Sequence, residues 1–407
     1  MNRTKRRRSP QLSTIEESGA TIGLDQFQSW TTLTDKNQRP GIAGIGFALL
    51  GIFGEVGSLL SELKKKQRDS NSYVAYHDSV IEEFGDVLWY LANAALRAGL
   101  RLSGVSRRIP AKLSDWNYEG RAAARSFADL QRRKRTFKGP RSSKLVERRL
   151  LALAGKVGTL LDDFSSRKID DNRDALSGHL VEVLRTVLAA ADDADVSLNE
   201  AARRNLLKTF GRWPIIPIYE PIFDEAYDQD EQLPRRIVMQ FVETTVRGRK
   251  YVLQKCNGVN IGDRLTDNKL EPDDYRFHDV FHLAYAAILG WSPVLRALFR
   301  VKRKSNPDVD ENQDGARAIL IEEGIATWIF NHGVRHKNFE NVTTLDYSLL
   351  KAIRELVTGY EVESRPLWQW ERAVLEGWRI FREMKKHRGG IVTADLINHT
   401  IKFRAPK

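Results

Sequence analysis

Cysteine is almost absent from this chain, since Cys256 is the single one among 407 residues. One thiol cannot close an intramolecular disulfide, so a disulfide-stabilised scaffold is excluded and a reducing, cytoplasmic location is expected. No apolar run approaches 18 residues, and therefore no membrane-spanning helix is expected. The segment 1–19 is basic and then acidic without an apolar centre, so no secretory signal is expected.

Positive charge exceeds negative charge, and the excess is concentrated in short segments. The net charge is +12, with basic clusters at residues 3–8, 132–135 and 300–304. Such clusters attract the phosphates of nucleotides or nucleic acids. No helix-turn-helix, zinc-finger or RNA-binding motif accompanies them, so nucleic acid is expected to bind only non-specifically. Attraction of a polyanionic nucleotide is a sufficient reason for the charge.

Acidic side chains interrupt two apolar segments of helical character, residues 54–58 and 82–89. Glu55 and Glu62 fall on one face of the first helix, because each residue turns a helix by about 100°. Glu83 and Asp86 are three residues apart and share a face of the second helix. Carboxylates gathered between packed helices repel one another unless a cation lies among them. Hard oxygen ligands of this kind favour Mg²⁺ or Mn²⁺ and a phosphate-containing substrate.

These two segments resemble a known family. Residues 47–66 and 81–96 are similar to the signature helices of the MazG-type all-α nucleoside triphosphate pyrophosphohydrolases, which carry Glu-x-x-Glu and then Glu-x-x-Asp. The resemblance implies that Glu55, Glu83 and Asp86 bind Mg²⁺ or Mn²⁺ and act in catalysis. Ser58 replaces the second Glu of the first pair, and Glu62, one turn further on, is the candidate substitute ligand.

The acidic region is repeated further along the chain. Residues 153–164 echo residues 52–63, and residues 181–184 echo residues 85–88. Basic side chains replace two acids in the second copy, where Lys156, Thr159, Asp163, His179 and Glu182 stand for Glu55, Ser58, Glu62, Glu83 and Asp86 respectively. A lysine and a histidine in place of two carboxylates disfavour a divalent metal, so the second copy is predicted to be catalytically inactive.

The second copy has another expected role, because MazG-type modules generally pair two-helix hairpins into a four-helix core. A tandem repeat would supply that partner within one chain. The family pattern also has an Asn in a later helix, where the first copy has Ile109 and the second has Asn205. Asn205 and Lys208 are therefore predicted to complete the acidic site of the first copy and to bind substrate, unless Asn205 is an ordinary helix-surface residue.

A different pattern begins after Trp213-Pro214, because the residue before a proline is disfavoured in a helix. Residues 236–246 and 250–255 are β-branched and aromatic around Gly248, which predicts a β-hairpin. Helices are predicted at residues 279–289, 315–331, 345–358 and 367–386. The segment 390–403 alternates like a strand, so this part is predicted to be an α+β domain.

The third segment contains two histidines, His278 and His282, four residues apart on one helix face, a spacing suited to a transition metal. Glu322 and Glu323 follow on a later helix, and Glu322 is the candidate third ligand. Asp279 stands where a zinc peptidase has its catalytic Glu, and its shorter side chain makes it a poor general base. Histidine pairs of this kind are also common as hydrogen-bonded core residues.

Residues 274–282, 302–305 and 314–323 resemble the MazG C-terminal domain, whose chemistry is not assigned. Their charged side chains also suggest a second possibility, an anion site suited to phosphate or a nucleotide. Its candidate residues are Arg276, His278, His282, Lys302, Arg303, Lys304 and Arg317, with acids nearby.

The predicted organisation has five segments, namely a disordered basic tail (1–24), a first repeat (25–115), a basic linker (116–144), a degenerate second repeat (145–213) and an α+β domain (214–407). The predicted fold is mainly α, with tandem hairpins forming a four-helix core before the α+β domain. The leading function is Mg²⁺-dependent hydrolysis of nucleoside triphosphates to monophosphate and pyrophosphate, with a homo-oligomer possible. The alternatives are a catalytically weak nucleotide-binding regulatory or phage-conflict protein, and a metal-dependent hydrolase at His278, His282 and Glu322.

Overall fold

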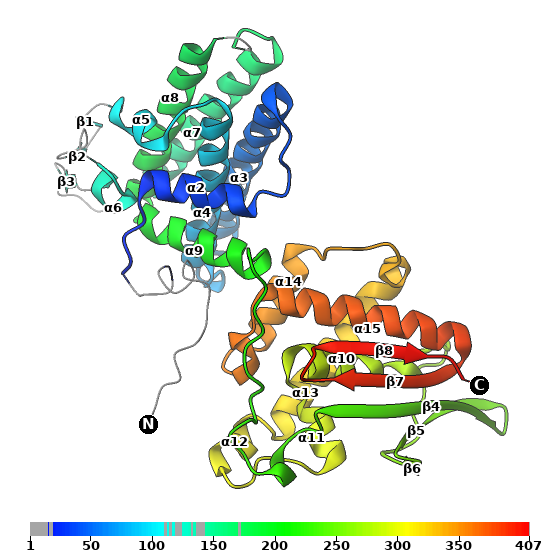
Figure 1. The fold of residues 1–407 in the computed structure, drawn as a ribbon. Coiled ribbons are helices and arrows are strands. Elements are labelled where there is room, and N and C mark those ends of the chain that lie inside the picture. The colour runs from blue at the N-terminus through cyan, green and yellow to red at the C-terminus, as the bar shows by residue number, and fades with distance from the viewer. Residues whose placement is uncertain are drawn as a thin grey trace. The chain divides into compact units, whose positions relative to one another are not determined.

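The computed structural model describes Ile15 and residues 19–109, 112–113, 116–118, 124–131, 133–135, 143–169 and 172–406. The chain forms two compact units, residues 1–218 and 219–407, each with its own hydrophobic core (Figure 1). The protein is mainly helical, at 61% helix, with a five-stranded antiparallel sheet in the C-terminal unit. The prediction of a mainly helical protein with an α+β C-terminal part is therefore confirmed at this level.

Helices dominate the N-terminal unit. They are α2 (Leu24–Thr34), α3 (Gly41–Asp69), α4 (Tyr76–Arg97), α5 (Leu102–Arg107), α6 (Phe127–Leu130), α7 (Ser143–Ser165), α8 (Arg173–Asp193) and α9 (Leu198–Arg212). The short strands β1 (Lys112–Leu113), β2 (Trp116–Tyr118) and β3 (Arg133–Arg135) form a small antiparallel sheet. The signature segments 47–66 and 81–96 are the central parts of α3 and α4.

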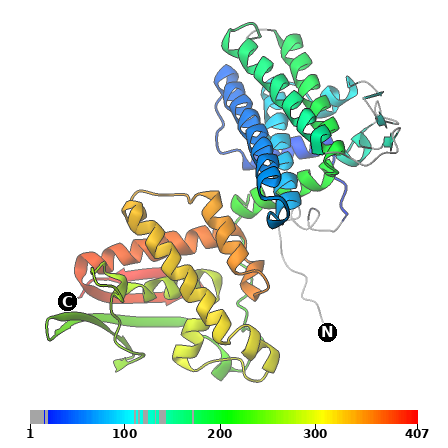
Figure 2. The same cartoon turned by 180° about the vertical axis from the view of Figure 1, so that it is seen from behind.

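Two helical hairpins, α3–α4 and α7–α8, lie side by side and build the core of this unit (Figures 1 and 2). Apolar residues recur along α3 at helical spacing, and Leu49, Ile52, Val56 and Leu59 are all buried. Burying such a stripe against a second hairpin removes apolar surface from water, which is the main favourable term in folding. The two halves of the sequence repeat thus pack against each other within one chain.

The third helix of each repeat packs on the hairpin of the other repeat. Helix α9 contacts α4, and α5 contacts α8. The side chain of Ser197 accepts a hydrogen bond from the backbone N–H of Glu200 at the start of α9, a favourable N-cap. Helix α9 then continues for 15 residues, whereas α5 has 6 and ends shortly before Pro110. Proline disfavours the helical conformation in the residue before it.

Two segments that were expected to lie outside the core contribute to it. Ile22 and Leu24, assigned to the basic tail, are buried in the N-terminal core. Phe127 and Leu130, assigned to the linker 116–144, are buried in the same core. Apart from Ile15, residues 1–18 lie outside the described residues, as do most of residues 132–142. The charge pattern therefore did not reveal that these four residues belong to the N-terminal core.

Helix α3 and its extension to Ser72 are long and apolar enough to cross a membrane, by length and composition alone. The bent pair Tyr275–Leu289 and Pro293–Phe299 passes the same test only if it is counted as one span. Core helices of globular proteins also meet this criterion. Helix α3 packs against α4 and α7 and carries Glu55 and Glu62.

The C-terminal unit is built on an antiparallel sheet with the order β6-β5-β4-β7-β8. Its strands are β4 (Arg236–Val246), β5 (Arg249–Cys256), β6 (Val259–Asn260), β7 (Gly389–Asp395) and β8 (Thr400–Arg404). The predicted hairpin is confirmed, and Arg247 and Gly248 both have positive φ in its turn, as a two-residue hairpin loop requires. The predicted strand at 390–403 is wrong in one respect, because it is two paired strands, β7 and β8.

Two long helices, α10 (Asp279–Leu289) and α15 (Leu367–His387), pack together against β7 and β8 (Figure 1). Helix α10 is apolar on every side and nearly all of it is buried, as expected for a central helix. The remaining helices are α11 (Pro293–Phe299), α12 (Pro307–Asn312), α13 (Ala316–Arg335) and α14 (Tyr347–Leu356), with short 3₁₀ turns including η4 (Tyr275–Phe277). The four predicted helices of this unit correspond to α10, α13, α14 and α15.

Candidate metal centres

Three carboxylates converge where α3 and α4 pack together. Glu55 comes from α3, and Glu83 and Asp86 come from successive turns of α4. One carboxylate oxygen from each lies within 4.8 Å of the other two. All three residues are half-buried, so water only partly screens their mutual repulsion. The structure thus brings together the three residues that the sequence pattern singled out.

Burial and mutual repulsion raise the pKa values of the three carboxyl groups in this cluster. Burial, followed by the charges of Asp86 and Glu55, raises the pKa of Glu83 from 4.5 to about 8. Burial and then Asp86 raise the pKa of Glu55, and burial raises the pKa of Asp86 despite the opposing charge of Lys208. Without a cation, this group therefore keeps a proton near neutral pH. A divalent cation would relieve the same repulsion, and the all-oxygen donor set fits a hard ion such as Mg²⁺ or Mn²⁺.

Helix α9 of the second repeat supplies the other side of the cluster. Asn205 Nδ2 donates a hydrogen bond of 2.7 Å to Asp86 Oδ1, and Lys208 donates to both oxygens of Asp86. Asn205 Oδ1 is buried and has no hydrogen-bond partner among the residues that the structure describes. A buried acceptor without a partner is costly unless a ligand or water satisfies it. The two residues predicted to complete the site therefore lie beside Asp86.

Gly85 allows this close approach of α9. A Cβ atom at position 85 would lie 2.6 Å from the carbonyl oxygen of Ala201 and 3.0 Å from Cβ of Asn205. Any larger residue would push α9 away from α4, and Asn205 and Lys208 would move with it.

Glu82 also belongs to this neighbourhood, although the sequence analysis did not assign it a role. Its Oε1 lies 3.6 Å from Lys208 Nζ, and its charge contributes to the raised pKa values of Glu55 and Glu83. Glu82 is four residues before Asp86, which places both on one helix face. The four-residue spacing from Asp86 could therefore have indicated that Glu82 lies near the cluster.

Glu62 does not join the cluster, which corrects the prediction that it replaces the missing glutamate at Ser58. Its buried carboxylate accepts a hydrogen bond of 2.6 Å from Lys65 and another from the hydroxyl of Tyr73. Tyr73 lies between α3 and α4, where helical periodicity cannot predict which side chains come together. Glu62 therefore fixes the end of α3 to the following turn.

Ion pairs occupy the equivalent positions of the second repeat. Lys156 Nζ lies 3.5 Å from Glu182 Oε2, and His179 Nε2 lies 3.1 Å from Asp163 Oδ2. Lys156 thus neutralises Glu182, and an imidazole accompanies Asp163, at positions where the first repeat has carboxylates. This arrangement leaves no charge imbalance for a divalent cation to correct.

A second group of potential ligands lies in the C-terminal unit. Ligand atoms of His278, Asp279 and His282 lie within 4.8 Å of one another. Glu323 Oε2 on α13 lies 3.7 Å from His278 Nε2 and 3.4 Å from His282 Nε2. Asp279 Oδ1 lies 3.1 Å from His278 Nε2. The two histidines and two carboxylates therefore face one another across α10 and α13.

Glu322, the predicted third ligand, lies behind His282 instead. Its Oε1 accepts from His282 Nδ1 at 2.9 Å and from Ser292 Oγ at 2.7 Å, and its Oε2 accepts from the backbone N–H of Val294 at 2.8 Å. Burial alone would lower the pKa of His282, but the charge of Glu322 raises it well above its usual range. The adjacent Glu323 faces the Nε2 atoms, since neighbouring residues on a helix point about 100° apart.

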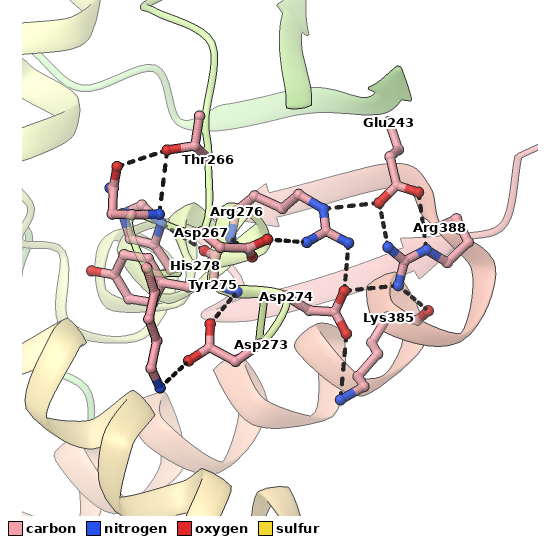
Figure 3. Close-up of polar contacts among 12 residues, drawn as sticks. Glu243, Thr266, Asp267, Asp273, Asp274, Tyr275, Arg276, His278, Lys385 and Arg388 are labelled. Carbon is pink, nitrogen blue, oxygen red and sulfur yellow. Dashed lines mark hydrogen bonds and ion pairs between the residues drawn. The ribbon is translucent and has the colours of Figure 1, made fainter. Parts of the chain in front are cut away.

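Arg276 is not available to bind an anion, which corrects that prediction. Its buried guanidinium lies among Glu243, Asp267 and Asp274, and Arg388 joins Glu243 to Asp274 from the end of α15 (Figure 3). These pairs connect β4, the turn before α10 and the end of α15. The network therefore fixes η4, the turn that leads directly into His278.

The remaining basic candidates also lie away from the histidines. Arg303 is buried against Asp314 and Glu361, which accept its hydrogen bonds. Lys304 and Arg317 are exposed, and Lys302 is half-buried. None of these four residues lines the cavity beside His278. The predicted anion site is therefore wrong, because carboxylates already neutralise its two buried arginines, Arg276 and Arg303.

Two contacts around the histidines were not predicted. Gln254 on β5 donates a hydrogen bond to Asp279 Oδ2. The ring of Tyr275 stacks on His278 with 4.1 Å between ring centroids. The sequence could not predict the contact of Gln254 with Asp279, because it depends on how β5 packs against the start of α10.

Comparisons with known proteins concern mainly the C-terminal unit. Residues 218–407 match the family model described as the MazG C-terminal domain, which confirms that resemblance. A 74-residue stretch is 34% identical to the Gene 37 protein of Mycobacterium phage L5, covering 18% of this chain and 65% of that protein. No solved structure matches the chain. The family match covers residues 218–407, so the similarity to the MazG C-terminal domain is shown for the C-terminal unit alone.

Proposed function

We propose that the N-terminal unit is a divalent-metal-dependent nucleoside triphosphate pyrophosphohydrolase. The observation that carries the proposal is the convergence of Glu55, Glu83 and Asp86 from the first repeat with Asn205 and Lys208 from the second. The MazG-related C-terminal unit supports it, since such domains accompany pyrophosphohydrolase modules in the resemblance described above. The second repeat would then serve as scaffold and as the source of two site residues.

Glu55, Glu83 and Asp86 are the residues that would hold Mg²⁺ or Mn²⁺. When bound there, the ion would neutralise triphosphate charge and increase the acidity of water. Lys208, 15% exposed, lies beside Asp86, and its positive charge would favour a phosphate group bound there. The orphaned Asn205 Oδ1 offers an acceptor to a bound ligand.

The proposed reaction breaks one phosphoanhydride bond. A water oxygen attacks the α-phosphorus, the bond from that phosphorus to the bridging oxygen breaks, and pyrophosphate leaves. Glu55 or Glu83 accepts the proton of the attacking water. The products are a nucleoside monophosphate and pyrophosphate.

The test is a panel of canonical and modified NTPs and dNTPs with Mg²⁺ or Mn²⁺, scored separately for pyrophosphate and orthophosphate. We expect the wild type to release pyrophosphate and Asp86→Asn to lose about 100-fold or more of this activity. Mutation of a residue that only supports a metal ligand already lowers activity by about 10–100-fold, and Asp86 is itself a proposed ligand. Glu182→Gln, at the equivalent position of the second repeat, is the matched control and should retain activity. Release of orthophosphate alone would contradict attack at the α-phosphorus.

A second candidate function, nucleotide binding without turnover, is favoured by Ser58 and by the position of Glu62. Helix α3 contributes Glu55 alone to the cluster, since Glu62 is paired with Lys65 and Tyr73. The same panel separates the two functions. Saturable, Asp86-dependent nucleotide binding without any pyrophosphate would identify the binding protein.

A further inference from the structure

The two imidazoles of the C-terminal unit have their Nδ1 atoms already engaged. His278 Nδ1 lies 2.9 Å from the carbonyl oxygen of Tyr275, and His282 Nδ1 lies 2.9 Å from Glu322 Oε1. A carbonyl oxygen only accepts, so Nδ1 of His278 must carry the proton. A neutral imidazole protonated at Nδ1 has its lone pair on Nε2, the atom that would bind a metal.

The Nε2 atoms of both imidazoles face the same carboxylate oxygen, Glu323 Oε2. His282 is fully buried, and its Nε2 makes no hydrogen bond. The nearest acidic oxygen, Glu323 Oε2, lies 3.4 Å away and also approaches His278 Nε2. Both Nε2 atoms thus face one carboxylate oxygen at ion-pair distance, without a hydrogen bond of good geometry to Nε2 of His282 among the described residues, and a divalent cation would satisfy all three groups.

We propose that His278, His282 and Glu323, with Asp279, bind one divalent transition-metal ion of the zinc class. Imidazole nitrogens with carboxylate oxygens suit such ions better than Mg²⁺. Bonds of about 2.1 Å to a tetrahedral ion place ligand atoms about 3.4 Å apart. The distances of 3.1, 3.4 and 3.7 Å between the proposed ligand atoms fall around that value.

Other side chains hold these ligands in position, as partners of metal ligands commonly do. Glu322 fixes the ring of His282 and is itself held by Ser292 and the backbone of Val294. Gln254 donates to Asp279. Tyr275 stacks on His278, while the Arg276 network shown in Figure 3 anchors the turn that carries both.

A cavity of about 450 Å³ opens onto this cluster. His278, Asp279 and Glu323 line it together with Gln254, and most of its remaining wall is apolar, from the loop after β6, η4, α11 and α13. A pocket of this size and lining accommodates a small molecule beside the ion. The site would therefore offer a Lewis-acidic centre to a small ligand, independently of the acidic cluster in the N-terminal unit.

The test uses the full-length protein without a polyhistidine tag. Metal content is measured after purification without added metal, and the metal-free protein is then titrated with Co²⁺ in excess Mg²⁺. We expect about one transition-metal ion per chain and the visible absorption of four-coordinate Co²⁺. Glu323→Gln should weaken Co²⁺ binding by about 100-fold or more, and Glu322→Gln, a positioning change, by 10–100-fold.

The controls separate this site from others. Glu323 is 38% exposed in its side chain, so its substitution by glutamine leaves the core intact. His332 and His336 are another pair four residues apart, and the double variant His332→Asn/His336→Asn should bind Co²⁺ like the wild type. Asp86→Asn should also retain the Co²⁺ spectrum, since that residue belongs to the N-terminal cluster.

Two results would overturn the proposal. One is a wild-type protein that binds no stoichiometric Co²⁺, which would identify His282 as a protonated partner of Glu322 and Glu323. The other is unchanged Co²⁺ affinity in both Glu323→Gln and His278→Asn, which would place the ion elsewhere.

Discussion

Protonation of Glu83 links the stability of the metal-free N-terminal unit to pH. The pKa of Glu83 is raised from 4.5 to about 8, so the folded chain binds more protons than the unfolded chain between these values. The free energy of unfolding therefore falls as pH rises through this window. In EDTA, the melting temperature of this unit should decrease between about pH 5 and pH 8, as measured by scanning calorimetry.

Glu83→Gln removes the titrating group and should flatten this decrease. Mg²⁺ should restore stability at the upper end of the window, because it binds the ionised form. If the wild-type melting temperature followed the same pH curve as that of Glu83→Gln, Glu83 would be ionised throughout this pH range and its pKa would not be raised.

Single residues also show where sequence reasoning reached its limit. The i, i+3 spacing of Glu83 and Asp86 was sufficient to place them on one face, and the structure brings them together with Glu55. Spacing alone did not distinguish Glu322 from Glu323, because that choice depends on the rotation of α13 against α10. Nor did it reveal that Arg276 is neutralised by three carboxylates, those of Glu243, Asp267 and Asp274.

At the scale of elements, the distance between α4 and α9 determines whether Asn205 reaches Asp86. Gly85→Ala places a methyl group 2.6 Å from the carbonyl oxygen of Ala201, so α9 must shift. Overpacking of this kind typically costs about 1–3 kcal/mol. We expect a lower melting temperature and a loss of nucleotide hydrolysis larger than the loss of folded protein at the assay temperature.

Gly155→Ala is the matched control for this substitution. Gly155 is exposed on α7, and a Cβ there meets no atom within 4 Å. Alanine at an open helical position should stabilise the protein by up to about 1 kcal/mol. If Gly85→Ala were equally stabilising and fully active, α9 would not need its close contact with α4.

Helices and strands were easier to predict from the sequence than the contacts between them. Helices with a continuous apolar stripe, such as α3, α4 and α15, and the hairpin β4–β5 follow from periodicity and turn residues. The exchange of α5 and α9 between hairpins could only be suspected from Ile109 and Asn205, since contacts between distant segments leave no local pattern. The small sheet β1–β2–β3 and the buried residues of α6 interrupt a segment whose basic charge resembled a linker.

The whole molecule consists of two units with separate cores and different candidate ions. Each unit should therefore unfold in its own transition, and each ion should stabilise only the unit that binds it. Calorimetry should show Mg²⁺ raising one melting temperature and Zn²⁺ the other. Asp86→Asn should abolish the first shift alone and Glu323→Gln the second alone; a single transition that responds to both ions would contradict this independence.

The crossing of α9 onto α4 and of α5 onto α8 has a consequence for stoichiometry. A symmetric pair of hairpins would present two equivalent pockets, and occupancy of one could influence the other. Here one hairpin carries the carboxylate cluster and the other carries salt bridges at the equivalent positions, so we expect each chain to bind a single nucleotide with a hyperbolic saturation curve. The second repeat therefore adds scaffold but no second site. A substitution that displaces α9 cannot be compensated by α5, although both helices occupy the same place in the repeat.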